Sequence, residues 1–242
     1  MEPRKKVKSR VYGIDHHDSH WEVQEWHLDI RQFHIYLTGE DVNYQSGDND
    51  REEPGVEYKM SARFIKNLHI LSQIDPRRPI LIHMKTTGGD WIEGIAIYDT
   101  IKLCTNPITI LSYTHARSMS SIILQAADRR LLMPHSYFLF HEGSDGFSGT
   151  NKAFRSYAKW GEKTENIMLD IYTERLKQKG KYSRRAPDRI REILKQEMDT
   201  KEDVYLTAQE AVEWGFADEV FWGNWASLTK FSKKFKKQIT PV

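Results

Sequence analysis

The amino-acid sequence predicts an α/β protein with one main domain, and three observations support this. Short apolar runs typical of strands alternate with longer stretches in which apolar residues recur every three or four positions. Glycine-rich or small-residue turns separate the two kinds of segment, as in an open α/β sheet. The 242 residues are 39% hydrophobic and 29% charged, which is enough to bury one core and too apolar for a disordered chain.

The first third of the chain begins with a polar segment and then becomes periodic. Residues 1–30 show no period of two or 3.6, so we expect a flexible amino-terminal arm there. Apolar and polar residues alternate over 33–37, which predicts a strand, and residues 44–54 are rich in Gly, Asp and Asn, which predicts a loop. Helical spacing of apolar residues over 60–71 predicts the first helix.

Strands and helices alternate regularly over the middle of the chain. The apolar run 79–84 predicts a buried strand that ends at Gly88-Gly89, and a helix is expected over 91–103. The same plan repeats with a strand over 107–113 and a helix over 118–127. The last two strands of this part are expected over 131–133 and 137–140.

The carboxy-terminal third is mainly helical. We expect a long helix over 151–179 that ends near Gly180 and a second, charged helix over 186–197. Thr207 and Glu210 have the spacing of a capping box before a short helix. Residues 230–237 contain five lysines, which predicts a solvated, frayed terminus, and a nucleic-acid or acidic surface is the less favoured interpretation of these lysines.

Charge and composition restrict the classes of partner. The 36 basic and 34 acidic residues leave a formal net charge of +2, so no global field draws the chain to nucleic acid or membrane. The single cysteine excludes an intrachain disulfide framework and suits a reducing compartment. No apolar run reaches the roughly 18 residues of a membrane span, so we expect a soluble cytoplasmic protein with no membrane partner. His16, His17, Asp18 and His20 could be metal ligands, but no second half of a site accompanies them and we predict no metal.

Three expected strand ends carry residues that packing does not explain: Gly88-Gly89, Ser118 and His141. The carboxyl ends of strands in an open α/β sheet border the crevice where ligands bind, so these residues are expected to converge. Ser118 is equally compatible with a nucleophile at a helix start and with a simple N-cap. A serine nucleophile needs a base, for which His141 is the candidate, and an acid that orients it. The acid stays open among four residues: Asp128, Asp145, Asp203 and Asp218.

Five short blocks extend this pattern along the chain. They are 33–39; Thr87-Gly88-Gly89 with Gly94, Ile97, Tyr98, Asp99 and Thr100; 116–120; Met133-Pro134-His135-Ser136 with Phe140-His141; and 199–203 followed by 205–208, Glu210-Ala211, Trp214-Gly215 and Asp218. In this order they resemble the Clp protease proteolytic subunit (ClpP) family of serine peptidases over residues 31–222. The resemblance implies the ClpP/crotonase-like fold of repeated ββα units, with a protruding long handle helix in a handle region about 148–197. After the matched domain we expect a basic tail over 223–242.

The resemblance also implies the roles of individual residues. Ser118 would be the nucleophile, His141 the base and Asp203 the acid, and the N–H groups of Gly89 and Met119 would form the oxyanion hole. Substrate would lie along four further residues: Gly88, Asp90, Glu142 and Gly143. The implied protein is a serine endopeptidase that cleaves unfolded polypeptides inside a homo-oligomeric barrel of stacked heptameric rings. It needs no cofactor of its own, because a separate AAA+ unfoldase partner uses the ATP.

The sequence departs from the family pattern at several positions. Thr87 replaces the proline before Gly-Gly, Glu142-Gly143 replaces Gln-Pro, and extra residues are expected near 44–58 and 178–187. The resemblance implies docking of the unfoldase at Leu81 and His83, where His83 replaces an aromatic residue, and a ring-to-ring contact at Lys201 and Glu202, whose order of charges is reversed. We interpret that reversal as a device against mixed particles with an ordinary ClpP.

Three alternative functions compete with this one. A virus-encoded maturation peptidase of the same fold fits the departures, and a catalytically silent ring subunit fits the fold alone. The complete set of Ser118, His141 and Asp203 argues against a silent subunit and against an acyl-CoA enzyme of the related crotonase group, which needs no such set.

Overall fold

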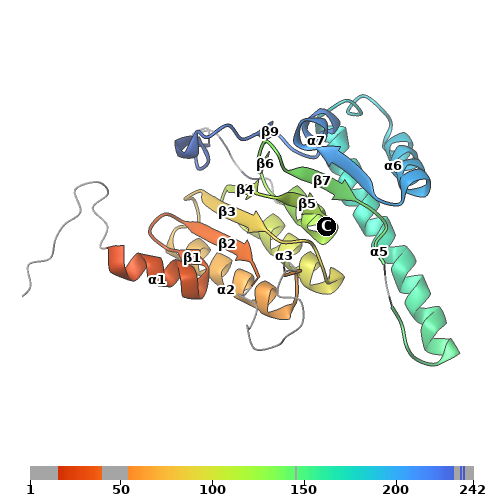
Figure 1. Cartoon of the computed structure of the whole chain (residues 1–242), viewed down its shortest axis with the longest axis horizontal. Helices are drawn as coiled ribbons and strands as arrows, with labels where there is room; N and C mark the ends of the chain where they lie inside the picture. The colour runs from red at the N-terminus through yellow and green to blue at the C-terminus, as the bar shows by residue number, and fades with distance from the viewer. Residues whose placement is uncertain (1–15, 40–53, 145, 232–234, 236, 238–242) are drawn as a thin grey trace, which may run out of the picture.

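A computed structural model describes residues 16–39, 54–144, 146–231, 235 and 237, and for residues 16–20 it describes the backbone alone (Figure 1). The basic start of the expected arm, most of the expected loop over 44–54, and Asp145 lie outside the described residues. The remaining elements form a mixed α/β structure, as the sequence predicts.

Two sheets organise the chain. The larger sheet has the strand order β1-β2-β3-β4-β6-β9, and all its neighbouring pairs are parallel except β1 with β2. The smaller sheet has the order β5-β7-β8, with β5 parallel and β8 antiparallel to β7. The strand bounds are β1 Leu28–Asp29, β2 His34–Thr38, β3 Ile80–Lys85, β4 Ile108–Ser112, β5 His115–Arg117, β6 Arg129–Leu132, β7 Tyr137–Phe140, β8 Val204–Thr207 and β9 Glu219–Val220.

The helices after residue 54 correspond to the periodic segments of the sequence, whereas α1 corresponds to none. Their bounds are α1 His16–Trp26, α2 Tyr58–Ile74, α3 Trp91–Leu103, α4 Met119–Gln125, α5 Asn151–Gln178, α6 Pro187–Lys201 and α7 Ala208–Trp214, with a short 3₁₀ helix, η1 Trp225–Ser227. The capping box of Thr207 and Glu210 is present at the start of α7. Helix α5 extends well beyond the body of the molecule (Figure 1), as expected for a handle helix.

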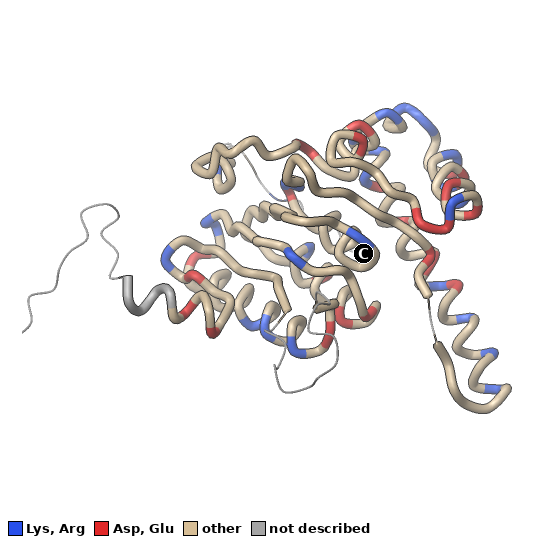
Figure 2. The backbone as a smooth tube through the Cα atoms, in the orientation of Figure 1, with Lys and Arg blue, Asp and Glu red and all other residues tan. Residues whose placement is uncertain are grey.

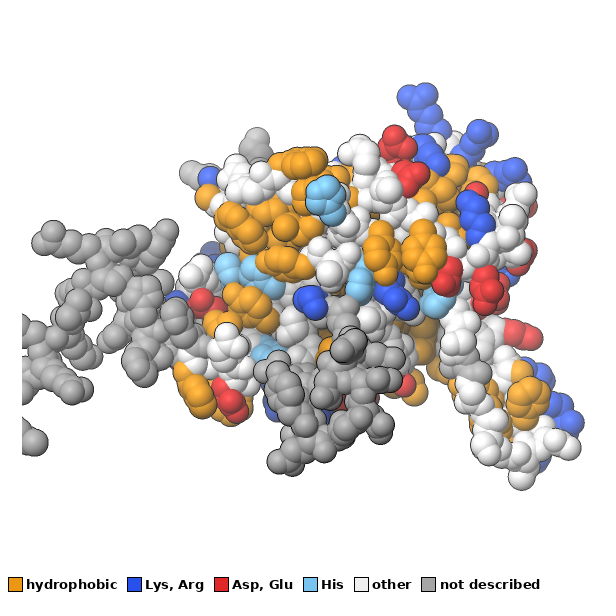
Figure 3. All heavy atoms as spheres, in the orientation of Figure 1, with side chains coloured by type: hydrophobic (Ala, Val, Ile, Leu, Met, Phe, Trp, Pro, Cys, Tyr) orange, Lys and Arg blue, Asp and Glu red, His pale blue; other side chains and the backbone are white. Residues whose placement is uncertain are grey.

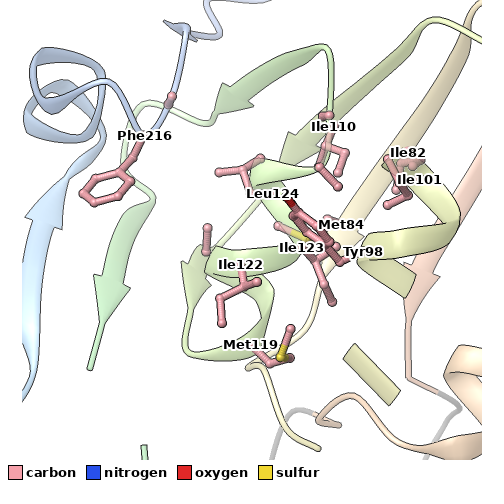
Figure 4. Packing of buried hydrophobic residues seen from close by; sticks show 14 of the residues in the cluster. Ile82, Met84, Tyr98, Ile101, Ile110, Met119, Ile122, Ile123, Leu124 and Phe216 are labelled. Atoms are coloured by element: carbon pink, nitrogen blue, oxygen red, sulfur yellow. The ribbon is translucent and has the colours of Figure 1, made fainter. Parts of the chain in front are cut away.

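The core packs around α4, the helix that follows Ser118. Every residue of α4 is buried, although the helix has only seven residues. Ile122, Ile123 and Leu124 lie close to Met84 and Ile110 of the large sheet and to Tyr98 of α3 (Figure 4). A helix this short is not stable alone, so its position is determined by tertiary packing.

The prediction of a flexible arm is wrong for its described part. Residues 16–26 form α1, and Leu28 of β1 is buried and pairs with Ile35 of β2. The side chain of Asn67 in α2 donates a hydrogen bond of 2.7 Å to the carbonyl of Trp26. These contacts are tertiary, so the local sequence pattern does not reveal them.

The prediction of a frayed basic tail is also wrong where the structure describes it. Leu228 is buried, and its carbonyl accepts a hydrogen bond of 2.7 Å from Thr109 of β4. Lys237 donates to the carbonyl of Ile101 at 2.8 Å and pairs with Asp128 at 3.3 Å, and its side chain is only 6% exposed. The described residues Leu228 and Lys237 of the tail therefore contact the domain.

The connection from α5 to α6 is strongly basic. Lys and Arg residues cluster along it (Figure 2), over the region where the sequence is expected to have extra length. Lys177 closes the connection by donating to the carbonyls of Ser183 at 3.0 Å and Arg185 at 2.9 Å.

None of the helices in the described part of the chain is long and apolar enough to cross a membrane.

Candidate active site

Ser118 lies in a tight turn between β5 and α4. Its backbone has φ 50° and ψ −130°, a conformation that a residue with a side chain rarely adopts, and its hydroxyl makes no capping hydrogen bond to α4. The interpretation of Ser118 as a simple N-cap is therefore wrong. Its N–H donates to the carbonyl of Leu139 at 3.1 Å, which attaches the turn to β7.

Neighbouring hydroxyl groups hold this turn in place. The hydroxyl of Ser120 accepts from the N–H of Arg117 at 3.0 Å and donates to the carbonyl of the same residue at 2.7 Å. The hydroxyl of Ser121 donates to the carbonyl of Ser118 at 2.6 Å and is 2.6 Å from the hydroxyl of Tyr172 on α5. Burial raises the pKa of Tyr172, which keeps this phenol neutral. The sequence analysis did not predict these hydrogen bonds of Ser120 and Ser121, because nothing in the local sequence distinguishes these two serines from other helix residues.

A chain of two hydrogen bonds joins three of the residues considered above. The Oγ of Ser118 is 2.9 Å from Nε2 of His141, and Nδ1 of His141 is 2.9 Å from Oδ1 of Asp203. His141 directly follows β7 and Asp203 directly precedes β8, so the antiparallel pairing of these strands brings the two side chains together. The imidazole is 23% exposed and the carboxylate 42% exposed, so both can be reached from solvent.

The other candidate acids have different partners. Asp218 receives hydrogen bonds from the buried guanidinium of Arg130 at 2.8 and 3.1 Å. Burial alone would raise the pKa of Asp218, but the hydrogen bonds and charge of Arg130 outweigh it and lower that pKa. Asp128 accepts from the N–H of Ile108 at 2.8 Å and pairs with Lys237. Among the described residues, Asp203 is the aspartate that contacts His141.

Gly88 and Gly89 lie directly against the serine turn. Gly88 has φ 97°, and a Cβ atom there would be 2.8 Å from the carbonyl oxygen of Arg117 and from the nitrogen of Met119. Gly89 has φ 135° and forms a parallel bridge with Val56. The N–H groups of Gly89 and Met119 have no hydrogen-bond partner within the described residues. The Gly-Gly segment thus borders the Ser118 side chain, and an oxyanion hole formed by the N–H groups of Gly89 and Met119 stays a prediction.

The expected substrate-binding residues surround this point. The carboxylate of Asp90 caps α3 by accepting from the N–H of Glu93 at 2.9 Å, and its own N–H donates to the carbonyl of Val56 at 2.9 Å. Glu142 and Gly143 follow His141 in exposed chain, and Gly143 has φ 90°. Their contact with substrate stays a prediction.

The expected docking residues are not at the surface of the described chain. Leu81 is 1% exposed and packs with Leu111, Leu131 and Leu228. His83 is 7% exposed, so the expectation that these two side chains form a docking surface is wrong. The face of the molecule drawn in Figure 3 carries groups of apolar side chains with histidines among them.

His83 is instead the buried centre of an aromatic cluster whose other rings are partly exposed. Its ring stacks on Tyr36 at 4.5 Å, its Nδ1 is 2.7 Å from the hydroxyl of Tyr113, and its Nε2 is 3.1 Å from Nδ1 of His34. Burial, helped by the charge of His34, lowers the pKa of His83 to about 3. Burial also raises the pKa of Tyr113 to about 12, so the whole cluster is neutral near pH 7.

The expected ring-contact residues end α6. Lys201 forms an ion pair of 2.5 Å with Glu197 one turn earlier, and Glu202 has φ 61° at the end of the helix, directly before Asp203. A contact with a second subunit stays a prediction.

Within the described residues no group of three His, Cys, Asp or Glu side chains could hold a metal ion, and the side chains of His16, His17, Asp18 and His20 are not described.

An α/β protein in which Ser, His and Asp are hydrogen-bonded in this order has the arrangement of the serine hydrolases. Comparison with known proteins identifies the family. The family model "Clp protease" matches residues 53–223. The chain belongs to the Clp protease family.

Curated relatives agree with this assignment. The chain is 32% identical over 169 residues to the ATP-dependent Clp protease proteolytic subunit 1 of Protochlamydia amoebophila, covering 68% of this chain and 76% of that protein. It is 29% identical over 167 residues to the ATP-dependent Clp protease proteolytic subunit of Deinococcus radiodurans, with the same coverage. It is 28% identical over 168 residues to subunit 2 of Tropheryma whipplei, covering 68% of this chain and 86% of that protein.

Proposed function

We propose that this chain is a serine endopeptidase, the proteolytic subunit of an ATP-dependent Clp-type protease. The observation that carries the proposal is the hydrogen-bonded chain from Ser118 through His141 to Asp203, with both distances at 2.9 Å. A catalytically silent subunit has no need to keep a serine in the strained backbone conformation seen here.

The first half of the reaction forms an acyl-enzyme. Nε2 of His141 takes the hydroxyl proton of Ser118 as Oγ attacks the carbonyl carbon of the scissile peptide bond. Asp203 accepts a hydrogen bond from Nδ1–H of the resulting imidazolium and stabilises its charge. The oxyanion is stabilised by the N–H groups of Gly89 and Met119, and the loss of one such donor typically costs about 3 kcal/mol. His141 then protonates the leaving amine, and the C–N bond breaks.

The second half releases the acyl group. A water molecule gives a proton to His141 as its oxygen attacks the acyl carbon, and the second oxyanion is held by the same two N–H groups. Collapse of this intermediate breaks the bond to Oγ, and His141 returns the proton to Ser118. The carboxylic acid product leaves and the free enzyme is restored.

The assembly is a homo-oligomeric barrel of stacked heptameric rings that works with a separate AAA+ unfoldase. The relatives are named as subunits of ATP-dependent proteases, which supports an ATP-consuming partner. The projecting helix α5 leaves Phe154 56% and Trp160 49% exposed, and exposed aromatic rings of this size support a contact between subunits. A barrel with internal sites admits unfolded polypeptide and excludes folded protein.

The test compares three substrates with the purified full-length protein. A short fluorogenic peptide and an unfolded protein should be cleaved without ATP, whereas a stably folded protein should resist unless a Clp-type unfoldase and ATP are added. Native mass measurement should give a stacked-ring particle. Rapid ATP-independent degradation of the folded protein, or full peptide hydrolysis by a monomer, would contradict the proposal.

A further inference from the structure

The small sheet has a second face that points away from the core. Successive residues of a strand point to opposite faces, and Ala116, Phe138, Phe140, Val204 and Leu206 of this sheet belong to the core cluster. The residues between them therefore share the other face. These residues are His115, Arg117, Tyr137, Leu139, Tyr205 and Thr207.

Strand register aligns this second face with the Ser–His–Asp arrangement. Arg117 is paired with Leu139, and Leu139 with Tyr205, so these three residues form one row across the three strands. His141 follows Leu139 by two residues, and Asp203 precedes Tyr205 by two residues. Both therefore lie on the same side of the sheet as this row. The row of Arg117 is therefore about 7 Å from the row of His141 and Asp203.

Contacts of Tyr205 support this arrangement. Its hydroxyl is 3.4 Å from Oδ2 of Asp203, and its ring is 5.6 Å from the ring of Tyr137 in the next row. Tyr205 is 58% exposed. Leu139, between Arg117 and Tyr205, is only 1% exposed. The second face thus forms a partly apolar floor that begins directly beside the reacting groups and is open to solvent along β8.

Arg117 is the cation of this floor, and no described residue compensates its charge. Its Nε atom is buried and has no hydrogen-bond partner, and no acidic side chain of the described chain pairs with its guanidinium. The buried arginine of β6 differs in this respect: Arg130 donates to Asp218, Gln125 and the carbonyl of Gly215. A partly buried guanidinium without a partner is a ready site for an anion, and its planar fork of donors matches a carboxylate.

We propose that Arg117 is a specificity-determining residue that binds a carboxylate of the polypeptide substrate close to the scissile bond. This inference rests on the proposed peptidase function and adds the class of substrate that it prefers. The carboxylate is that of an Asp or Glu side chain or that of the chain terminus. Both present the same planar anion, and the tyrosine rings of the floor contact the apolar part of the residue that carries it.

The experiment uses internally quenched peptides of one length and one neutral parent sequence. In one series Asp, Asn or Lys replaces each residue in turn around the cleaved bond, and in a second series the peptide ends in a free carboxylate or in an amide. At one position or terminus, we expect kcat/KM to be at least about tenfold higher for the anionic peptide than for its neutral isostere, which is the usual effect of a hydrogen bond to a charged group. The first series detects a side-chain carboxylate and the second a terminal one.

Three substitutions of Arg117 test the assignment. Arg117→Ala should bring the ratio of anionic to neutral peptide to within about twofold of unity, Arg117→Lys should retain part of the preference, and Arg117→Glu should shift it toward the Lys peptide. Arg184→Ala removes an exposed arginine from the connection between α5 and α6 and should keep the wild-type ratio. Added salt should reduce the ratio of the wild type, because exposed charges are screened.

Several results would overturn the inference. They are a wild-type ratio near unity in both series, an unchanged ratio in Arg117→Ala, and an Arg117→Ala protein that loses its oligomeric mass and cleaves all peptides equally poorly. Hydrolysis of the neutral peptide that depends on Ser118 would in each case leave the proposed peptidase function intact. Failure of the wild type to cleave any peptide, together with no labelling by a serine-directed reagent, would overturn the proposed function itself.

Discussion

At the scale of single residues, the reactivity of Ser118 depends on where its hydroxyl points. A serine that caps a helix uses its oxygen to accept a backbone N–H, whereas here the strained backbone directs Oγ to His141 at 2.9 Å. Two of the candidate acids are distinguished by their hydrogen-bond partners. Asp203 contacts His141, and Asp218 contacts Arg130.

Substitution of these two aspartates by asparagine should have opposite effects. Asp203→Asn should lower turnover by several orders of magnitude with little change in stability, because the amide favours the wrong histidine tautomer. Asp218→Asn should reduce the free energy of unfolding by about 3 kcal/mol, because it weakens the partner of a buried arginine. Peptide hydrolysis and urea unfolding of both variants measure the two effects, and an exchange of the two results would refute the assignment.

His83 should make stability depend on pH. Its pKa is lowered by burial from 6.5 to about 3 in the folded protein, so between these values the unfolded chain binds the proton more strongly. The stabilising effect of neutral His83 is complete above pH 6.5 and is lost as the pH falls toward 3, by up to about 1.4 kcal/mol per pH unit.

The variant His83→Phe separates this effect from the titration of other groups. It loses the hydrogen bonds to Tyr113 and His34, so it should be less stable than the wild type at pH 7 by about 1–2 kcal/mol. The difference should shrink as the pH falls from 6.5, because the phenylalanine side chain has no proton to bind. Urea midpoints at pH 7, 6, 5 and 4 check this, and parallel curves for the two proteins would show that His83 does not titrate as expected.

At the scale of elements, the sequence predicts segments whose signal is local. The runs at 79–84 and 137–140 correspond to β3 and β7, and the helical spacing over 91–103 corresponds to α3 with the same bounds. The three residues of β5 and the two of β9 are too short to show a period, and α1 is held by contacts to other elements. The bond from His141 to Asp203 was not predictable from spacing either, because it depends on how β7 and β8 pair.

The segment Gly88-Gly89 gives the prediction at this scale. Gly88→Ala adds a methyl group to a residue with φ 97°, at 2.8 Å from backbone atoms of the serine turn, so the segment must move away from Ser118. A displacement of about 1 Å typically costs about 100-fold in rate, and kcat/KM should fall by about that factor. Gly161→Ala in α5 has open space around its Cβ and is the control, with an expected gain in stability of about 0.5–1 kcal/mol. Wild-type activity in Gly88→Ala would contradict the close approach.

At the scale of the whole molecule, the carboxy-terminal tail joins distant parts of the domain. Its residue Leu228 packs against the large sheet, and Lys237 reaches Asp128 at the start of β6 and Ile101 near the end of α3. Burial lowers the pKa of Lys237, and the nearby carboxylate of Asp128 opposes this effect. The tail therefore contributes to stability although its composition is that of a solvated terminus.

Replacement of Lys237 should measure this contribution. Lys237→Met keeps the length of the side chain and removes its charge, so the free energy of unfolding should fall by about 1–3 kcal/mol. Lys230→Met changes an exposed lysine of the same tail and should alter stability by less than about 0.5 kcal/mol. Equal thermal midpoints for wild type and Lys237→Met would mean that the tail does not hold the two segments together in solution.

The central claim is that Ser118 is a nucleophile activated by His141. Labelling of the native full-length protein with a serine-directed fluorophosphonate, followed by mass spectrometry of the intact chain and of its peptides, tests this claim most directly. We expect a single adduct located on Ser118, formed far more slowly in His141→Ala and absent in Ser118→Ala although that variant folds normally. Labelling at another residue, or equal labelling of wild type and Ser118→Ala, would contradict it.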